Sequence, residues 1–325
     1  MSWQTFRSDL RLWLVGGIAL VALLIVGRDL LQTGPKFTFP DCADTAATGV
    51  PQIECETLIA LYNASNGPEW TWSDHWGYSD AVCEWRGVTC EDGQVTALNL
   101  GDNNLGGTIP SGFRNFSKLR RLYLASNNLE GEIPPELADI ASLESLHLGA
   151  NQLTGEIPPE LANLSNLREL SLRANQLTGT IPAGLGGMET LTLLDLQKNQ
   201  LTGEIPPELG GLAYLRRLLL NTNQLSGAIP GALGNLESIL VLSLGLNQLS
   251  GAIPPELGDL TTLTELYLLD NDLSGEVPAT LANLTGIGGI RLCAGNALTV
   301  SDPAVIALLS EKDLACFPEE TPETP

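Results

Sequence analysis

Residues 122–134, LYLASNNLEGEIP, contain one copy of a pattern, L-x-L-x-x-N-x-L-x-G-x-I/V-P, that recurs along most of this chain. Its asparagine returns every 24 residues in eight copies. The eight residues are Asn103, Asn127, Asn151, Asn175, Asn199, Asn223, Asn247 and Asn271. A fixed period of this length indicates stacked units, each of which forms one coil of a solenoid. A solenoid offers an extended surface for binding and rarely a pocket for chemistry.

Seven apolar positions accompany the asparagine, at −8, −5, −3, +2, +6, +10 and +13 relative to it. In the second copy these are Leu119, Leu122, Leu124, Leu129, Ile133, Leu137 and Ile140. The two-residue spacing of Leu122 and Leu124 is that of a β-strand, and coils that all run in one direction stack such strands into a parallel sheet. The later three-residue spacing predicts a 3₁₀ or loose helical turn on the back, where prolines prevent a long helix.

The repeated asparagines are predicted to be structural. A chain that turns away from its strand leaves backbone N–H and C=O groups inside the solenoid, and each unpaired buried group costs about 1–3 kcal/mol. An asparagine side chain carries donors and an acceptor, so a column of them can satisfy the turn in every coil. The glycine four residues later, such as Gly131, fits a tight bend with positive φ.

The pattern resembles the plant-type leucine-rich repeat, L-x-x-L-x-L-x-x-N-x-L-x-G-x-I-P-x-x-L-x-x-L-x-x, over eight repeats at residues 95–290. The resemblance implies an α/β solenoid, a right-handed superhelix with a concave parallel β-sheet. Members of this subtype bind proteins, peptides or glycans, usually outside the cell. In length, cap cysteines and repeat subtype the chain is similar to polygalacturonase-inhibiting proteins and to receptor-like ectodomains without a kinase domain.

Both ends of a solenoid need caps that cover the terminal leucines. The N-terminal cap is expected over residues 37–94, where residues 56–62 have helical spacing and residues 83–90, CEWRGVTC, resemble the W-x-G-V-x-C element of the plant-type cap. Four tryptophans lie in this region: Trp70, Trp72, Trp76 and Trp85. We interpret them as a cover for the first coil, with a sugar-binding platform as the alternative.

The C-terminal cap is expected over residues 291–317. The ninth coil degenerates there, because Asn296 arrives one residue late and no G-x-I-P follows it. Residues 303–315 are predicted to form a short amphipathic helix. A polar, proline-rich tail over residues 318–325 is expected to be disordered.

All six cysteines lie in the predicted caps: Cys42, Cys55, Cys83, Cys90, Cys293 and Cys316. We interpret them as disulfides at the solenoid ends, which indicate an oxidising compartment. The expected pairs are Cys83–Cys90, Cys293–Cys316 and Cys42–Cys55. Zinc is the rival interpretation, but the sequence has no C-x-x-C pair and only two histidines, His75 and His147. We expect no metal and no cofactor.

The first 36 residues contain an apolar segment at about residues 12–27, preceded by Arg7 and Arg11. Its length lies between a signal-peptide core and a full membrane span of ~20 residues. An uncleaved signal-anchor is favoured, because no convincing small-x-small cleavage site follows; a cleaved export signal is the alternative. The cysteines place everything after residue 30 outside the cytoplasm. The protein is therefore expected at the cell surface, or secreted if the segment is cleaved.

The net charge of −22 argues against a nucleic-acid partner, because a phosphate backbone needs a basic footprint. The strand positions expected on the concave face hold seven basic and six acidic residues, so that strip is nearly neutral. Much of the acidic excess lies in G-E-I-P-P-E-L segments on the flank and back, as at Glu132 and Glu136. These carboxylates recur coil after coil, which is typical of a solvated face and not of an enclosed catalytic pair.

No enzyme is predicted, since the sequence has no G-x-S-x-G, no H-E-x-x-H and no phosphate loop. The leading hypothesis is a non-catalytic, N-terminally anchored protein that binds a protein or peptide on its concave face. The alternatives are a secreted enzyme inhibitor or glycan binder of the polygalacturonase-inhibitor type, and a structural component of a wall or envelope.

The candidate ligand-binding residues combine charged, aromatic and apolar side chains on the expected concave strands. They are Arg120, Arg121, Tyr123, His147, Arg168, Arg173, Leu193, Arg216, Arg217, Leu219, Val241, Tyr267 and Leu269. The apolar members are expected to be exposed together, and such clusters mark interaction sites. The alternative is that Arg120, Glu144 and Arg168 pair with each other along one column.

Overall fold

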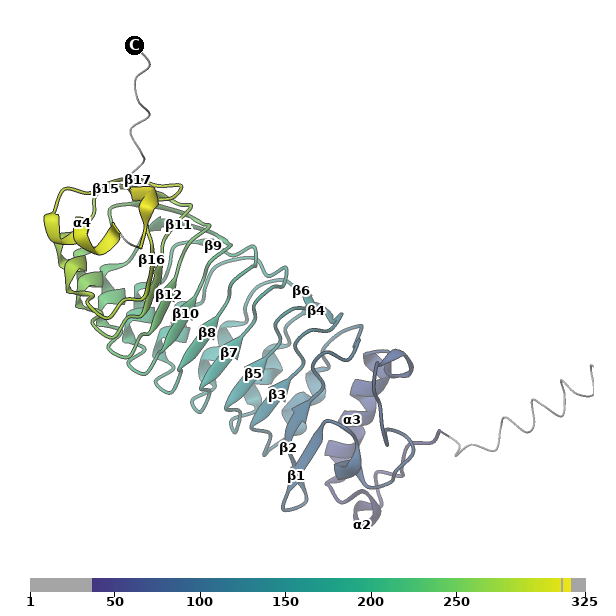
Figure 1. The fold of residues 1–325 in the computed structure, drawn as a ribbon. Coiled ribbons are helices and arrows are strands. Elements are labelled where there is room, and N and C mark those ends of the chain that lie inside the picture. The colour runs from purple at the N-terminus through teal and green to yellow at the C-terminus, as the bar shows by residue number, and fades with distance from the viewer. Residues whose placement is uncertain (1–36, 311, 317–325) are drawn as a thin grey trace, which may run out of the picture.

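The computed structural model describes residues 37–310 and 312–316 of the chain (Figure 1). The predicted signal-anchor at residues 12–27 and the tail at residues 318–325 lie outside the described residues. Within the part that is described, no helix has both the length and the apolar character needed to cross a bilayer.

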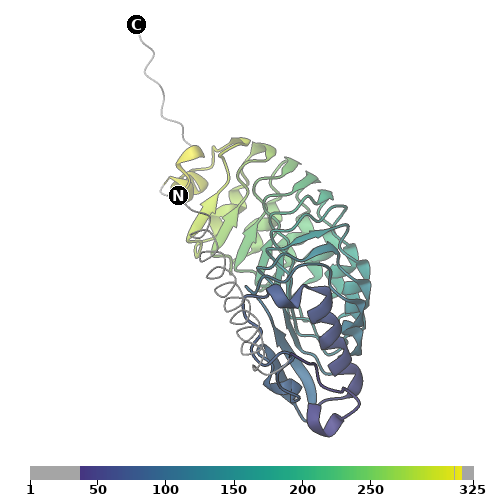
Figure 2. The same ribbon diagram turned by 90° about the vertical axis from the view of Figure 1, so that its right-hand side faces the viewer.

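A curved sheet of ten strands runs the length of the solenoid and forms its concave face (Figures 1 and 2). Its strands are β1 (Val88–Glu91), β2 (Gln94–Asn99), β3 (Arg121–Tyr123), β5 (Ser145–His147), β7 (Glu169–Ser171), β8 (Leu193–Asp195), β10 (Arg217–Leu219), β12 (Val241–Ser243), β14 (Glu265–Tyr267) and β16 (Gly289–Arg291). β1 pairs antiparallel with β2, and every later neighbour is parallel. The predicted parallel sheet is confirmed.

The strands are in register at one repeat per strand, so that Leu122 pairs with Leu146 and Leu146 with Leu170. Because side chains alternate between the two faces of a strand, this register aligns all the inward leucines in columns. Both strand leucines of every coil, from Leu98 to Leu268, have no exposed surface. Full burial of one leucine stabilises the fold by roughly 1.5–3 kcal/mol. The stacked leucines are therefore the main source of stability.

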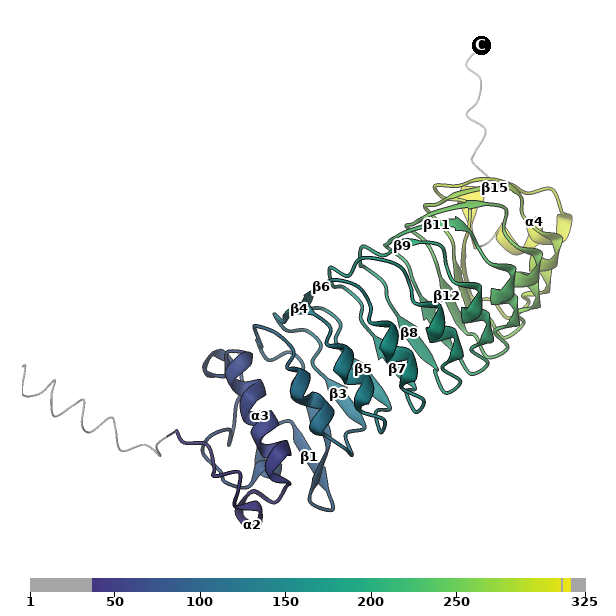
Figure 3. The same cartoon turned by 180° about the vertical axis from the view of Figure 1, so that it is seen from behind.

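Short 3₁₀ helices form the back of the coils, as Figure 3 shows. They are η3 (Ser111–Asn115), η4 (Pro135–Asp139), η5 (Pro159–Asn163), η6 (Ala183–Gly187), η7 (Pro207–Gly211), η8 (Gly231–Asn235), η9 (Pro255–Asp259) and η10 (Ala279–Asn283). Each begins directly after a proline, such as Pro134, and buries a central apolar residue, such as Leu137. The 3₁₀ prediction for the back is confirmed.

Further parallel strands follow the ladder asparagines along one flank, at the upper edge of the solenoid in Figure 1. One sheet contains β9 (Thr202–Gly203), β11 (Gln224–Ala228), β13 (Gln248–Gly251), β15 (Asp272–Glu276) and β17 (Ala297–Thr299), and a second contains β4 (Glu130–Glu132) and β6 (Gln152–Thr154). The repeated glycine lies in or beside these strands and has a positive φ in every repeat, 78° at Gly131 and 76° at Gly203. Its predicted role in a bend is confirmed.

The asparagines form a continuous hydrogen-bonded column. The Nδ2 group of Asn175 donates to the carbonyl oxygens of Leu172 at 3.0 Å and of Leu148 at 3.1 Å. Its Oδ1 atom accepts the backbone N–H of Leu153 at 3.0 Å. The same three bonds recur from Asn127 to Asn271. The structural prediction is confirmed.

A ninth asparagine extends the ladder at its C-terminal end, and the first one connects it to the N-terminal cap. Asn296 accepts the N–H of Leu273 at 3.0 Å, so the late asparagine of the ninth coil still belongs to the column. The one-residue delay of Asn296 was predicted, but its place in the ladder was not. At the other end, Asn103 accepts the backbone N–H of Trp72 at 2.7 Å. Its buried Nδ2 group has no partner among the described residues, because no earlier coil supplies a carbonyl.

The N-terminal cap contains α2 (Thr45–Thr48), α3 (Gln52–Ala64), η1 (Gly67–Glu69) and η2 (Val82–Glu84). The predicted helix at residues 56–62 is the middle of α3. Glu54 of α3 is 1% exposed, and its carboxylate accepts the N–H of Val95 in β2 at 2.8 Å. Burial raises the pKa of Glu54, and this hydrogen bond opposes the shift.

The C-terminal cap contains α4 (Pro303–Leu309) and η11 (Leu314–Cys316). The predicted helix at residues 303–315 is too long, because the chain turns after Leu309. The turn lets the buried carboxylate of Asp313 accept the N–H groups of Leu292 and Cys293. It also brings Cys316 to Cys293, with 5.0 Å between their Cα atoms.

Three disulfides join the cysteines in the expected pairs, Cys42–Cys55, Cys83–Cys90 and Cys293–Cys316. Their Cα–Cα distances of 5.6, 5.7 and 5.0 Å are ordinary for this bond. Cys293 and Cys316 lie near Asp313, but both sulfurs are already bonded to each other. The disulfide therefore accounts for this cluster.

Candidate ligand-binding face

The concave face is organised in columns that run across the strands. One column contains Arg121, Ser145, Glu169, Leu193, Arg217, Val241 and Glu265, and the next contains Tyr123, His147, Ser171, Asp195, Leu219, Ser243, Tyr267 and Arg291. Six strand steps separate Tyr123 from Tyr267. At ~4.8 Å per strand, the two tyrosines are roughly 29 Å apart along the face.

An aromatic and acidic cluster occupies the N-terminal part of this face. The rings of Tyr123 and His147 meet edge to face with 4.7 Å between their centroids. The Nε2 atom of His147 lies 2.9 Å from Oε2 of Glu169 on the next strand. All three side chains are half-buried. The structure thus brings together Tyr123 and His147, which were both predicted as binding residues.

The middle of the face is a floor of small or buried side chains. Ser171, Asp195 and Ser243 are 5–8% exposed. Burial raises the pKa of Asp195, and the backbone N–H of Gln197 and the charges of Arg173 and Arg217 oppose the shift. Glycines and small residues elsewhere on the face let longer side chains lie over them; the Cγ of Arg173, for example, lies only 2.6 Å from the position that a Cβ on Gly149 would take.

The prediction for Leu219 is wrong. It was predicted to be an exposed apolar contact, but it is only 7% exposed. It lies in the floor column between Asp195 and Ser243, where the inward curvature of the sheet brings neighbouring side chains together. The alternation of residues in a strand predicts which face of the sheet a side chain lies on. It does not predict how much of that side chain the neighbouring residues of a curved sheet will bury.

The remaining apolar candidates are half-buried. Leu193 and Val241 lie on either side of Arg217 in the same column, since β10 pairs with both β8 and β12. Leu269 leans over Gly245, and Leu246 beside it is 48% exposed. The predicted cluster therefore exists as half-covered apolar surface around an exposed arginine.

The basic candidates are mostly unpaired. Arg120 forms an ion pair with Glu91 at 3.2 Å, so the predicted alternative of pairing with Glu144 is wrong. Five others are exposed: Arg121, Arg168, Arg173, Arg216 and Arg217. Among the residues that the structure describes, none of these five forms an ion pair within 4.0 Å. Their guanidinium groups remain available to a ligand.

The C-terminal end of the face contains two residues that sequence reasoning missed, Arg291 and Lys312. Together with Tyr267, Gly288 and Gly289 they line a hollow of about 230 Å³. Burial and the neighbouring Glu265 carboxylate raise the pKa of Tyr267. Arg291 continues the Tyr267 column into a ninth strand, and a register count extended past the eighth repeat would have found it.

Two repeat models of one family match the chain. A leucine-rich repeat model matches residues 93–153, and a second, single-repeat model matches residues 166–188, 190–212, 214–236 and 262–284. With the asparagine ladder and the parallel sheet, these matches decide the family. The chain belongs to the leucine-rich repeat family.

Similar proteins of known structure include plant receptor ectodomains and a plant ice-binding protein. The plant peptide hormone receptor RGFR1, solved in complex with RGF2, is 40% identical, with a TM-score of 0.62 over 63% of this chain and 33% of that chain. The ectodomain of the receptor kinase GASSHO1/SCHENGEN3 from Arabidopsis thaliana, in complex with CASPARIAN STRIP INTEGRITY FACTOR 2, is 36% identical, with a TM-score of 0.64 over 76% and 33%. A plant ice-binding protein is 27% identical, with a TM-score of 0.66 over 77% and 88%.

One curated relative, Protein MALE DISCOVERER 1 of Arabidopsis thaliana, is 45% identical over 53 residues, which are 16% of this chain and 7% of the relative. This leucine-rich repeat protein therefore spans only a small part of that relative and about a third of the two receptor chains.

Proposed function

We propose that this leucine-rich repeat protein is an extracellular, non-catalytic binding protein whose concave face engages an extended segment of a protein or peptide. The observation that carries the proposal is the set of five exposed, unpaired arginines on a face that also presents half-buried apolar and aromatic side chains. Arginine and tyrosine are residue types that anchor interfaces. Similar ectodomains solved with peptide hormones support this class of ligand.

The geometry suggests a ligand of limited length. An extended chain advances ~3.3 Å per residue, so the span from Tyr123 to Tyr267 accommodates about nine residues across the strands. The free guanidinium groups favour a segment that carries carboxylates. The apolar side chains around Arg217 would contact one or two apolar residues of the same segment.

The test is a pull-down with the full chain as bait, followed by affinity measurements on the captured ligand. Arg217→Glu and Tyr267→Ala are expected to weaken binding by about tenfold or more, as hot-spot truncations do. Arg114→Glu makes the same charge change on η3, on the back of the solenoid, and serves as the matched control. Leu219 is not a suitable test position, because a change at a buried residue would also disturb folding.

Two outcomes would overturn the proposal. The first is a captured ligand that binds both concave variants like the wild type while their melting curves are unchanged. The second is loss of binding in Arg114→Glu alone, which would place the ligand on the back.

We further propose that residues 12–27 remain in the mature protein as the membrane anchor, with the repeats outside the cytoplasm. The three disulfides support an oxidising compartment for the repeat domain. Mass analysis of the mature N-terminus, with carbonate extraction of membranes, tests this directly. A mature chain that starts after residue 27 would instead favour a secreted protein.

A second candidate function rests on the flank that bears the smaller sheets. In five successive coils the residues at +1 and +3 are uncharged and polar: Gln152, Thr154, Gln176, Thr178, Gln200, Thr202, Gln224, Ser226, Gln248 and Ser250. All ten are exposed or half-exposed, in a chain with 38 acidic residues. Amides and hydroxyls repeated at the strand spacing of ~4.8 Å suit an ordered polar surface. The likeness to a plant ice-binding protein makes ice the surface to test.

An ice-recrystallisation assay decides this second candidate. Wild type is expected to inhibit crystal growth, and Thr178→Glu with Thr202→Glu is expected to abolish inhibition without changing the melt. Inhibition that survives these changes, or none by the wild type, excludes this role for the flank.

A further inference from the structure

The four tryptophans of the N-terminal cap divide into two kinds. Trp70, Trp76 and Trp85 are 6%, 0% and 1% exposed, and each donates its Nε1–H to a backbone carbonyl oxygen. Trp72 is half-buried, and its Nε1–H has no hydrogen bond to any described residue. Buried indole N–H groups usually find a partner, so three rings serve the core and the fourth keeps a free donor. Trp72 also packs against the hydrophobic core, so the interpretation as a cover holds for all four, but it leaves the free indole N–H of Trp72 unexplained.

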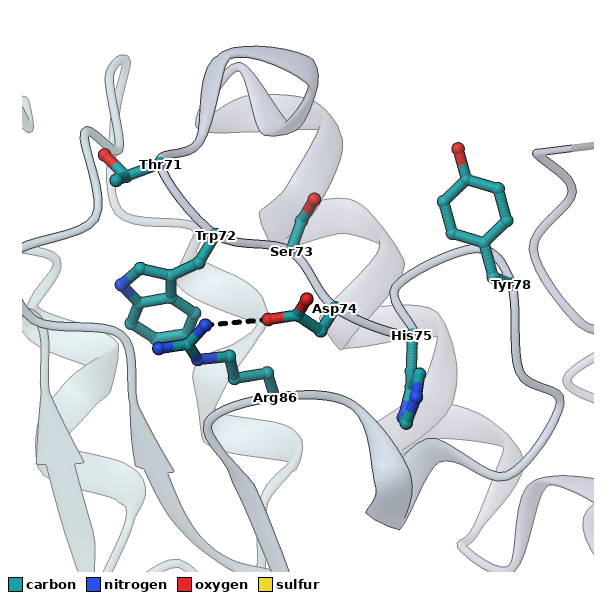
Figure 4. Close-up of a pocket in the computed structure, with 7 residues that line it drawn as sticks. All are labelled: Thr71, Trp72, Ser73, Asp74, His75, Tyr78 and Arg86. Atoms are coloured by element: carbon teal, nitrogen blue, oxygen red, sulfur yellow. Dashed lines mark hydrogen bonds and ion pairs between the residues drawn. The ribbon is translucent and has the colours of Figure 1, made fainter. Parts of the chain in front are cut away.

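Trp72 lies at one end of an open hollow of about 760 Å³ in the cap (Figure 4). The Arg86 guanidinium lies over its ring, 4.6 Å from the centroid. The Nη1 group of Arg86 also donates to Oδ2 of Asp74 at 2.7 Å, and both side chains are more than half exposed. That hydrogen bond lowers the pKa of Asp74, which keeps the carboxylate an acceptor. Such exposed ion pairs add little to stability, so the fold does not explain this arrangement.

The rest of the hollow offers unused hydrogen-bonding groups and one partly exposed ring, that of Tyr78, which contacts Phe37 edge to face. The hydroxyls of Thr71, Ser73 and Tyr78 have no hydrogen-bond partner in the described part of the chain, and Figure 4 shows those of Ser73 and Tyr78 on the same side of the loop. The Nδ1 atom of His75 lies 2.9 Å from the Glu84 carbonyl oxygen, which leaves Nε2 free. Tyr78 is 55% exposed and lies at the opposite end of the hollow from Trp72.

These groups match the chemistry of a sugar. The C–H face of a pyranose ring is weakly electropositive and packs on the negative face of an aromatic ring, here Tyr78. Sugar hydroxyls both donate and accept, and so pair with hydroxyls, a carboxylate and a guanidinium. The volume lies within the usual range for small-ligand sites. We propose that this hollow in the N-terminal cap binds a neutral glycan, with Tyr78 under a sugar ring and Trp72, Asp74 and Arg86 contacting hydroxyl groups.

The charge and the size of the hollow restrict the class of glycan that it can bind. Asp74 and Arg86 cancel, so the hollow provides no net positive charge, and the chain around it carries −22. Uronates and other anionic sugars are therefore repelled and neutral ones are not. Because Tyr78 and Trp72 stand at opposite ends of a hollow of about 760 Å³, we expect the ligand to have more than one sugar unit. None of the residues that line this hollow belongs to the concave-face columns, so the proposal does not rest on the proposed peptide site.

The experiment titrates the full chain with neutral oligosaccharides (cello-, xylo-, manno- and laminari-oligosaccharides) and with oligogalacturonate, by calorimetry and tryptophan fluorescence. At least one neutral oligosaccharide is expected to bind and to change the fluorescence. Tyr78→Ala is expected to weaken that binding by about tenfold, and Trp72→Phe, which keeps the packing and removes the N–H, by a smaller factor. Tyr214→Ala removes a tyrosine that is 65% exposed outside the cap and is the control.

Three results would overturn the proposal: no neutral oligosaccharide binding at millimolar concentration, binding of oligogalacturonate alone, or affinity unchanged in both Tyr78→Ala and Trp72→Phe with normal melting curves. Loss of binding in Tyr267→Ala but not in Tyr78→Ala would move the glycan to the concave face.

Discussion

The side-chain amide of Asn199 donates to the carbonyl oxygen of Leu172, 27 residues earlier in the chain, at 3.1 Å. It also donates to Leu196 of its own coil at 3.0 Å, while its Oδ1 atom accepts the N–H of Leu177 at 3.1 Å. One side chain therefore satisfies backbone groups in two neighbouring coils. Because a solenoid coil touches only its neighbours, this bridge contributes directly to the interface between them.

Replacing this amide should destabilise the fold without removing a ligand contact. Asn199→Leu leaves the N–H of Leu177 unpaired, whereas the carbonyls of Leu172 and Leu196 each keep one hydrogen bond, from Asn175 and Asn223. We expect a loss of about 1–3 kcal/mol, the cost of one unsatisfied buried group. Chemical denaturation measures the loss, and Gln200→Leu on the adjacent exposed position is the control. A variant with full stability and no ligand binding would contradict the structural role.

The buried leucines give a sharper test of the stacking. Leu172 has no exposed surface, and Leu172→Asp places an unpaired charge among leucines, which costs several kcal/mol. We expect a lowered melting temperature and proteolysis near the fourth coil. Gln176→Asp adds the same charge at an exposed position of the same coil and should melt like the wild type. An unchanged circular dichroism melt for Leu172→Asp would refute the stacking.

The repeat region was predictable because each physical requirement recurs eight times in the sequence. The leucine columns, the ladder asparagines and the positive-φ glycines each follow from a local physical requirement. Because each pattern recurs in every repeat, it can be distinguished from a chance arrangement of residues. The C-terminal disulfide was predictable as well, because only Cys293 and Cys316 lie in that cap. The four cysteines of the N-terminal cap allow three sets of pairs, so the pairing of Cys42 with Cys55 was not decided by the sequence.

The site was less predictable, because it depends on curvature and on long-range pairing. Leu219 points to the concave face as predicted, yet the curved sheet covers it. Arg120 pairs with Glu91 of the cap hairpin, a partner outside the repeat pattern. Arg86 meets Trp72 and Asp74 only because the cap folds back on itself, and no spacing in the sequence signals that contact.

The disulfides should all be present in the exported protein. Intact-mass analysis and thiol labelling without reductant are expected to find no free thiol among the six cysteines. Changing Cys293 and Cys316 together to serine opens the C-terminal bridge and should cost about 2–4 kcal/mol. Six labelled thiols in the native protein would instead indicate a reducing compartment.

The last prediction concerns the buried carboxyl group on the concave floor. Burial raises the folded-state pKa of Asp195 above its ordinary value of 3.8. At a pH between the ordinary pKa and the raised folded-state pKa, the folded protein holds a proton that the unfolded chain has released. The free energy of unfolding therefore falls as the pH rises through this range. The loss of stability persists at neutral pH, because the ionised carboxylate of Asp195 is then buried in the folded protein.

Asp195→Asn imitates the protonated group, and we therefore expect it to be more stable than the wild type at pH 7. The advantage should shrink as the pH falls and disappear below about 3.8, the ordinary pKa of the carboxyl. Denaturation midpoints across this range test the prediction, with the exposed Asp270→Asn as the control. If Asp195→Asn is instead less stable at pH 7, the charges of Arg173 and Arg217 outweigh burial, and Asp195 holds these arginines in place on the binding face.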